Sequence, residues 1–289
     1  MTDRVTVALG QLRPRLGDVS ANLEQHLAWI EQAKTNHAAL IVFPELGLTG
    51  YQVQDLTLDV ARTTKHPDIQ RLVAASQDID VVFSFVEESE QHLFYITAIY
   101  ARRGQIAAKH RKVYLPTYGM FDEGRYFACG EEFRTVPTDF GRSGLMICED
   151  AWHVSSPYLL ALGGADLICV PASGPARSVA EQDRFGSHVF WRDLLQVYAR
   201  LFGTYFIFVN RTGFEDGVNF FGGSGVISPE GEWLVEAPEL TETLCYAELD
   251  LSVIRRARYI TPILRDEKKH LVLRELERLL EHRERRDAE

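Results

Sequence analysis

A cysteine at the end of an apolar run is the first candidate for chemistry. Cys148 follows the residues Leu145-Met146-Ile147 and precedes the two acids Glu149 and Asp150. Folds that mix strands and helices present reactive groups at the carboxyl ends of strands, above the sheet. Cys148 is therefore the candidate nucleophile. The common alternative for a thiol beside an apolar strand is a small cysteine buried in the core.

Two further strand ends carry groups that would serve such a nucleophile. Glu45 follows the apolar run 40–43 and Pro44; a partly desolvated carboxylate there is suited to take a proton from a thiol and return it to a leaving amine. Lys112 closes the basic run 109–112, and strand alternation places it on the opposite face from Arg111. A lysine beside a cysteine favours the thiolate and stabilises an oxyanion. The alternatives are a capping or surface glutamate and a solvated basic face.

Short apolar strands alternating with amphipathic helices would position these groups. Strands are expected over residues 5–9, 40–43, 81–86, 93–100, 105–112, 144–147, 166–170, 205–209 and 225–227. Helices are indicated by the apolar faces Leu23/Leu27/Ile30 (capped by Asp18 or Ser20), Ile69/Leu72/Val73, Phe190/Leu194/Val197/Tyr198/Leu201 and Leu273/Leu276/Leu280. The strands from 81 to 112 look antiparallel, whereas others alternate with helices, so we expect mixed α/β sheets covered by helices. No linker divides the chain, which favours one domain over 1–289 with a helical tail at 266–289.

Composition excludes several classes of protein. The chain has 289 residues, 46% of them hydrophobic, and a net charge of −10 that disfavours nucleic acid as a partner. No secretory signal or membrane span is visible, so a cytoplasmic location is expected. The four cysteines include no C-x-x-C pair and should be free thiols, with Cys169 in the core. Cys148 and His153 match no zinc-ligand spacing, and no metal or organic cofactor is required.

Three peptides together resemble the nitrilase superfamily of carbon–nitrogen hydrolases, whose signature is a Glu, a Lys and a Cys at three strand ends. They are Phe-Pro-Glu-Leu at Glu45, Lys-Val-Tyr-Leu-Pro at Lys112 and Ile-Cys-Glu-Asp-Ala-Trp at Cys148. The similarity runs from about Val5 to about Arg265. It implies a four-layer α-β-β-α sandwich with these three residues as the catalytic groups.

Within the superfamily the sequence is most similar to the glutamine-hydrolysing domain of NAD synthetase. The resemblance rests on residues 45–51, 115–127 and 148–150, and it places Glu123 on a second active-site glutamate. Glu123 would then hydrogen-bond Lys112 and help to place the substrate or the hydrolytic water; the alternative from the residues alone is an exposed loop acid beside Asp122. Where those domains carry a Ser-Pro-aromatic segment for the glutamine head group, this chain has Ala172-Ser173-Gly174-Pro175-Ala176-Arg177, which puts glutamine in doubt as the substrate. Arg177 or Arg184 would instead pair with a substrate carboxylate, unless both are ordinary surface arginines. The expected substrate-binding residues are Tyr51, Tyr118, Phe121, Glu149, Trp152, Ser173 and Arg177.

The residues and the resemblance together imply an amidase that cleaves a small linear carboxamide to an acid and ammonia through a cysteine thioester. Lys112 and the backbone N–H of Glu149 would hold the oxyanion. Two alternatives stay open: a glutaminase subunit that passes ammonia to a separate NAD synthetase, and a catalytically idle binding or scaffold protein. By analogy with the family, a homodimer or larger homo-oligomer is expected.

Overall fold

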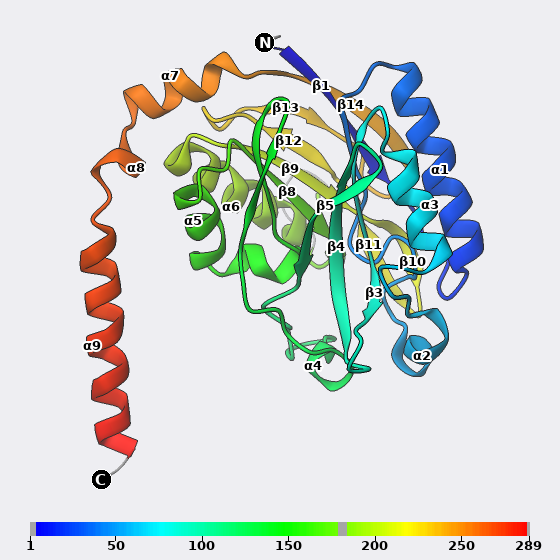
Figure 1. Ribbon diagram of the computed structural model, residues 1–289, viewed down its shortest axis with the longest axis horizontal. Coiled ribbons are helices and arrows are strands. Elements are labelled where there is room, and N and C mark those ends of the chain that lie inside the picture. Colours follow the sequence, from blue (N-terminus) through cyan, green and yellow to red (C-terminus); the bar gives the residue numbers. More distant parts are fainter. Residues whose placement is uncertain (1–3, 179–183, 288–289) are drawn as a thin grey trace.

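The computed structural model describes residues 4–178 and 184–287 and builds them around two six-stranded sheets (Figure 1). The first sheet has the strand order β14 (Thr243–Asp250), β1 (Arg4–Gln11), β2 (Leu40–Val42), β3 (Asp80–Glu88), β4 (Phe94–Arg102), β5 (Gln105–Arg111). The second has the order β13 (Trp233–Glu236), β12 (Gly225–Ile227), β9 (Tyr205–Asn210), β8 (Leu167–Ala172), β7 (Gly141–Leu145), β6 (Thr135–Thr138). A separate hairpin pairs β10 (Thr212–Glu215) with β11 (Val218–Phe221).

Both sheets have a parallel centre and antiparallel edges. In the first sheet β1, β2 and β3 run parallel, and β3, β4 and β5 then form the antiparallel meander that the sequence predicts. In the second sheet β7, β8 and β9 are the parallel strands. Because parallel neighbours end at the same edge of a sheet, this arrangement concentrates strand ends where chemistry can be placed.

Helices cover the outer face of each sheet and complete a four-layer α-β-β-α sandwich (Figure 1). The α-helices are α1 (Val19–Thr35), α2 (Thr57–Val60), α3 (Pro67–Ala75), α4 (Glu123–Tyr126), α5 (Ser155–Leu162), α6 (Gly186–Phe202), α7 (Ser252–Ile260), α8 (Ile263–Asp266) and α9 (Lys269–Asp287). Helices α1 and α3 lie on the first sheet, and α5 and α6 lie on the second. Asp18 caps α1, since its side chain accepts a hydrogen bond from Ala21 N.

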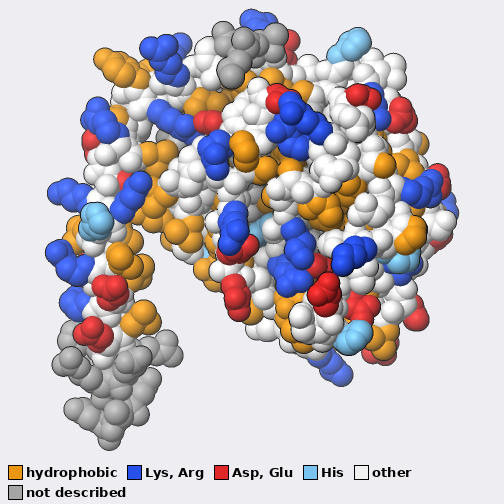
Figure 2. Space-filling view, in the orientation of Figure 1, with side chains coloured by type: hydrophobic (Ala, Val, Ile, Leu, Met, Phe, Trp, Pro, Cys, Tyr) orange, Lys and Arg blue, Asp and Glu red, His pale blue; other side chains and the backbone are white. Residues whose placement is uncertain are grey.

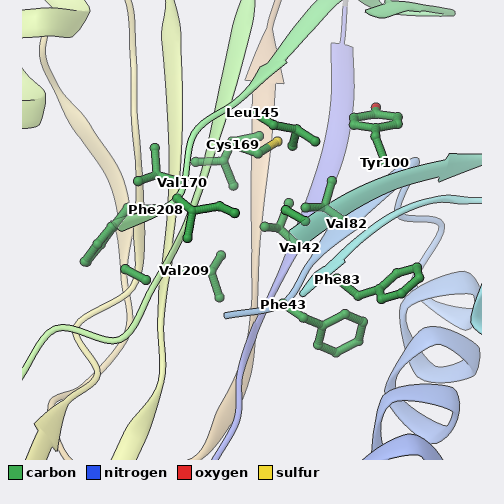
Figure 3. Close-up of a cluster of buried hydrophobic side chains, with 14 of the residues drawn as sticks. Val42, Phe43, Val82, Phe83, Tyr100, Leu145, Cys169, Val170, Phe208 and Val209 are labelled. Carbon is green, nitrogen blue, oxygen red and sulfur yellow. The ribbon is translucent and has the colours of Figure 1, made fainter. Parts of the chain in front are cut away.

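The core lies between the two sheets. Val42 and Val82 of the first sheet approach Val170 and Val209 of the second, and all four are fully buried (Figure 3). Cys169 lies in the same cluster, as the sequence predicts, and burial raises the pKa of its thiol. The strands therefore read as continuous apolar runs because both of their faces are covered.

The buried face of α6 differs from the predicted one. Of the five residues expected there, Tyr198 is buried, but Phe190, Val197 and Leu201 are exposed. The helix instead buries the row Trp191, Leu195, Tyr198 and Phe202 against the second sheet. The prediction was wrong because α6 carries two apolar faces, and periodicity alone does not say which one meets the sheet.

The C-terminal segment leaves the sandwich. Helix α9 falls within the expected helical tail at 266–289, whereas α8 precedes it and shares only Asp266 with it. Residues 288–289 of the expected tail lie outside the described part of the chain. Helix α9 extends away from the sheets (Figure 1), and Leu273, Leu276 and Leu280 are exposed along it. Figure 2 shows hydrophobic and charged side chains together on the surface of this helix. Within the residues the structure describes, no helix has the length and apolar character needed to cross a membrane.

Candidate active site

Three sequence-predicted residues lie just beyond the ends of strands. Glu45 comes three residues after β2 and Cys148 three residues after β7, so each extends a strand from the parallel part of its sheet. Lys112 follows β5 directly. All three side chains are buried, with Glu45 0% and Lys112 1% exposed. Charged side chains this deep are rare in proteins unless they are paired, which points to their neighbours.

Lys112 joins two carboxylates. Its Nζ donates hydrogen bonds to Oε1 of Glu45 at 2.7 Å and to Oε1 of Glu123 at 2.8 Å. Glu123 begins the short helix α4, and its Oε1 also accepts a hydrogen bond from the Tyr51 hydroxyl. Chain segments that are distant in sequence thus meet around one ammonium group, and its position is fixed from both sides.

The charges of this cluster set its protonation. Burial lowers the pKa of Lys112, but the negative charges of Glu123 and Glu45 outweigh it and hold that pKa well above its ordinary value. Burial and the charge of Glu45 raise the pKa of Glu123 to about 7, although Lys112 opposes the rise. At neutral pH the lysine is therefore cationic, and Glu123 is close to its midpoint of titration.

Cys148 occupies a strained turn. Its φ of 43° lies in the left-handed region that side chains other than glycine adopt rarely, and such strain persists only where the surroundings impose it. Burial and the charge of Glu45 raise the pKa of the thiol above its ordinary value, while Lys112 and a hydrogen bond from the Ser173 backbone lower it less. At neutral pH the group is therefore a thiol, and a base would have to remove its proton before the sulfur could act as a nucleophile.

Asp150 holds this turn in place, a role that the sequence did not predict. Its Oδ2 accepts a hydrogen bond from Ile147 N at 2.8 Å, and its Oδ1 accepts from Val113 N and Tyr114 N, each at 3.0 Å. His110 Nε2 contacts the same carboxylate at 2.8 Å. The fully buried carboxylate therefore ties the Cys148 turn to the chain that follows Lys112. The acid two residues after the cysteine was the only available signal.

The residues predicted to bind the substrate occupy different places. Tyr51 and Ser173 are buried, and Ser173 Oγ donates to the backbone oxygen of Glu45 at 3.1 Å. The Tyr118 hydroxyl donates to the carboxylate of Glu149 at 3.0 Å and 3.2 Å. Trp152 is half exposed and stacks on Phe190 of α6, with ring centroids 4.4 Å apart.

Of the two arginines considered for a substrate carboxylate, Arg184 forms an ion pair with Glu236. The guanidinium of Arg177 lies 5.3 Å from the ring centroid of Phe121, close to Gly119. Phe121 also meets Tyr118 edge to face, with ring centroids 5.7 Å apart, so Arg177 lies near the Tyr118–Glu149 contact. This region therefore offers one carboxylate and one guanidinium to a ligand.

A cavity of about 320 Å³ adjoins the Glu123 side of the cluster. The segments 51–54 and 120–123 line it, together with Arg125, Tyr126 and Phe127. Phe121 meets Tyr51 edge to face, with ring centroids 6.3 Å apart. Tyr51 and Glu123 line this cavity, and Glu123 also binds Lys112, which is not among the lining residues.

Comparison with known proteins agrees with this geometry. The model of the carbon-nitrogen hydrolase family matches residues 6–259. Glutamine-dependent NAD(+) synthetase of Thermotoga maritima is 31% identical over 264 residues, which are 90% of this chain and 44% of that protein. The Acinetobacter baylyi enzyme of the same name is 28% identical over 89% of this chain and 46% of its own length. The chain spans about half the length of these curated relatives.

Solved structures show the same fold. Carbon-nitrogen hydrolase from Helicobacter pylori G27 superposes with a TM-score of 0.82 and 26% identity over 92% of this chain and 96% of that one. An amidase from Nesterenkonia sp. has a TM-score of 0.78 and 25% identity over 93% and 95% of the two chains. The matched region spans Glu45, Lys112 and Cys148 and ends before the C-terminal helix. The chain therefore belongs to the carbon-nitrogen hydrolase family, whose members act on carbon–nitrogen bonds.

Proposed function

We propose that this protein is an amidase that cleaves a small linear carboxamide to the corresponding acid and ammonia through a thioester on Cys148. The observation that carries the proposal is that the two carboxylate oxygens of Glu45 have different surroundings. Its Oε1 is held by Lys112, while Oε2 is buried and has no hydrogen-bond partner among the described residues. A buried carboxylate oxygen left free costs stability and often marks a functional site. It is the atom that would receive the proton of the Cys148 thiol.

The first half of the reaction makes the acyl-enzyme. Glu45 takes the thiol proton, and the sulfur of Cys148 bonds to the amide carbonyl carbon. The carbonyl oxygen becomes an oxyanion, which the Lys112 ammonium and the backbone N–H of Glu149 stabilise. The carbon–nitrogen bond then breaks, and ammonia leaves with the proton held by Glu45.

The second half restores the enzyme. Glu45 takes a proton from a water molecule, whose oxygen attacks the thioester carbon. The carbon–sulfur bond breaks, the acid is released, and the proton returns to the sulfur of Cys148. Glu123 and Tyr51 hold Lys112 in place through both halves and do not exchange bonds with the substrate.

The charges beside Cys148 favour an amide with a polar far end. Glu149 with Tyr118 offers a carboxylate that would accept hydrogen bonds from an ammonium group, and Arg177 offers a guanidinium for a carboxylate. An ω-amide of an amino acid carries both groups. The relatives named as glutamine-dependent NAD synthetases favour a second candidate function, a glutaminase subunit that supplies ammonia to a separate synthetase.

An amide panel tests the proposal. Purified protein is incubated with glutamine, short aliphatic ω-amides and N-carbamoyl amino acids, and the released ammonia is measured. We expect turnover of at least one linear amide, loss of turnover in Cys148→Ala and Glu45→Gln, and unchanged turnover in Cys129→Ser, whose cysteine is exposed. Unchanged turnover in Cys148→Ala would refute the mechanism. Turnover of none of the amides, with an unreactive Cys148, would favour an idle binding protein, and a rise in ammonia release on addition of an NAD synthetase would favour the glutaminase subunit.

A further inference from the structure

A buried ion pair lies beside the active site and has no part in the proposed chemistry. Arg211 directly precedes the β10–β11 hairpin, and Glu215 is the last residue of β10. Arg211 Nη2 and Glu215 Oε2 are 2.7 Å apart, and the two side chains are 0% and 3% exposed. Arg211 Nε and Nη1 have no hydrogen-bond partner within the described part of the chain. A buried pair with such unsatisfied atoms is weak evidence for stability, because apolar residues of similar volume often stabilise a core as well or better. The pair therefore calls for another explanation.

The second oxygen of Glu215 binds the loop that carries Tyr51. Oε1 accepts hydrogen bonds from Tyr51 N and from Gln52 N, both at 2.7 Å. The loop fits closely around this carboxylate, since a Cβ on Gly50 would lie 3.0 Å from Glu215 Oε2 and Gly50 itself has a φ of +84°. Charge-assisted bonds to two successive amides fix both the position and the direction of the loop.

The fixed loop leads to Lys112 in two steps. The Tyr51 hydroxyl donates to Glu123 Oε1, and the same oxygen accepts from Lys112 Nζ. A second contact supports the Tyr51 ring. Phe220 of β11 packs against it, with ring centroids 5.8 Å apart, and the Arg211 guanidinium lies 4.3 Å from the Phe220 centroid. A shift of the loop would therefore change how Glu123 shares its oxygen between the tyrosine and the lysine.

We propose that Glu215, held by Arg211, is a positioning residue that sets Tyr51 against Glu123 and thereby orients Lys112. It touches neither Cys148 nor the substrate and acts only through Tyr51. The inference rests on the proposed function for its activity measurement, and the reactivity of the Cys148 thiol provides a measurement that does not require a known substrate.

A double-mutant cycle between Glu215 and Tyr51 tests this route. Glu215→Ala, Tyr51→Phe and the double variant are compared for kcat and KM with an amide that the wild type hydrolyses. They are also compared for the rate of Cys148 alkylation by iodoacetamide between pH 6 and pH 9, with the labelled cysteine located by peptide mass. We expect Glu215→Ala to lower kcat about tenfold with little change in KM, and to cost less than about twofold further when Tyr51 is already Phe. Both single variants should alter the pH profile of alkylation in the same direction.

A matched control separates positioning from stability. Asp166 also accepts a backbone N–H, that of Arg142 at 2.9 Å, and it pairs with Arg258 at 2.9 Å. Asp166→Ala should lower the melting temperature while kcat and the alkylation profile stay within about twofold of wild type. Glu215→Gln keeps an acceptor oxygen and should recover part of the activity. If Glu215→Ala does not fold, the cycle is run with Glu215→Gln.

The results of the cycle distinguish a positioning role of Glu215 from a purely structural one. If the effects of the Glu215 and Tyr51 variants multiply in full, or if the Glu215 variant loses only stability as Asp166→Ala does, the positioning role is wrong. If the wild type hydrolyses none of the amides, the proposed function fails, and the alkylation cycle alone still decides whether Glu215 acts through Tyr51.

Discussion

Protonation of His26 should weaken the fold beneath the Glu45 turn. His26 is fully buried in α1, with Nδ1 2.7 Å from Asn22 O and its ring 4.2 Å from that of Phe43. Nε2 has no hydrogen-bond partner among the described residues, and a Cβ on Gly47 would lie 3.1 Å from it. Added charge at Nε2 would be buried directly below the turn that carries Glu45, so the substitution to test is His26→Leu.

The size of the effect follows from the pKa shift. Burial lowers the pKa of His26 from 6.5 to about 4, although the hydrogen bond to Asn22 opposes the change. Between these two values the unfolded chain binds more protons than the folded one, so stability falls as the pH is lowered from 6.5 toward 4. At pH 4.5, about two pH units below the unfolded-state pKa, the wild type should have lost about 2.5 kcal/mol through this residue at about 1.36 kcal/mol per pH unit, and the loss should vanish well above pH 6.5.

Urea unfolding at several pH values measures this loss. The free energy of unfolding is determined for wild type and His26→Leu between pH 4.5 and pH 7.5, and the difference between them removes the contributions of all other groups. The variant should be about 1 kcal/mol less stable at pH 7.5, through the lost hydrogen bond, and more stable than wild type at pH 4.5. His37→Asn, at an exposed histidine just beyond the end of the same helix, is the control for the loss of a histidine elsewhere in the chain. A pH-independent difference for His26→Leu would refute the reasoning.

Three further predictions concern the site. Asp150→Asn should lower the free energy of unfolding by about 2 kcal/mol and kcat about tenfold, because one carboxylate holds three backbone N–H groups. Thermal unfolding and an ammonia-release assay measure the two effects, and a wild-type kcat in the variant would contradict the role of Asp150. Burial raises the pKa of Glu123 from 4.5 to about 7, so between these values the folded chain binds more protons than the unfolded one. As the pH rises through this range, the wild type should lose up to about 3 kcal/mol of stability relative to Glu123→Gln. If the free energies of unfolding measured in urea differ by the same amount at every pH, this prediction is wrong. Arg177→Gln should raise KM about tenfold or more for amides that bear a carboxylate and leave kcat unchanged, whereas equal KM changes for neutral amides would exclude carboxylate binding.

Sequence alone predicted the elements that depend on local pattern. The strand that leads to Glu45 is an apolar run, as predicted. A strand also leads to Cys148, but β7 covers Gly141–Leu145, including the polar Arg142 and Ser143, and not the apolar run 144–147 that marked it in the sequence. The antiparallel meander from β3 to β5 was also readable, because its strands are adjacent in sequence and joined by short turns.

Contacts between distant segments could not be read in this way. Strand β14 pairs with β1 across nearly the whole chain, and the hairpin β10–β11 contains glycine and acidic residues that weaken its strand pattern. The same limit applies to the site. Asp150 and Glu215 bind backbone groups of segments that only the folded chain brings to them. The position of Asp150 two residues after Cys148 was the one signal for that residue, and no pattern in the sequence marked Glu215.

The proposed mechanism requires a thioester on Cys148, and a quenched turnover reaction detects it. The protein is mixed with a hydrolysed amide, stopped in acid within the first turnovers and measured by intact mass, and the modified residue is then located by peptide mass. We expect a mass increase equal to the amide minus ammonia, on Cys148 alone, and no adduct or ammonia release in Cys148→Ala. An adduct on another residue, or continued turnover in Cys148→Ala, would contradict it.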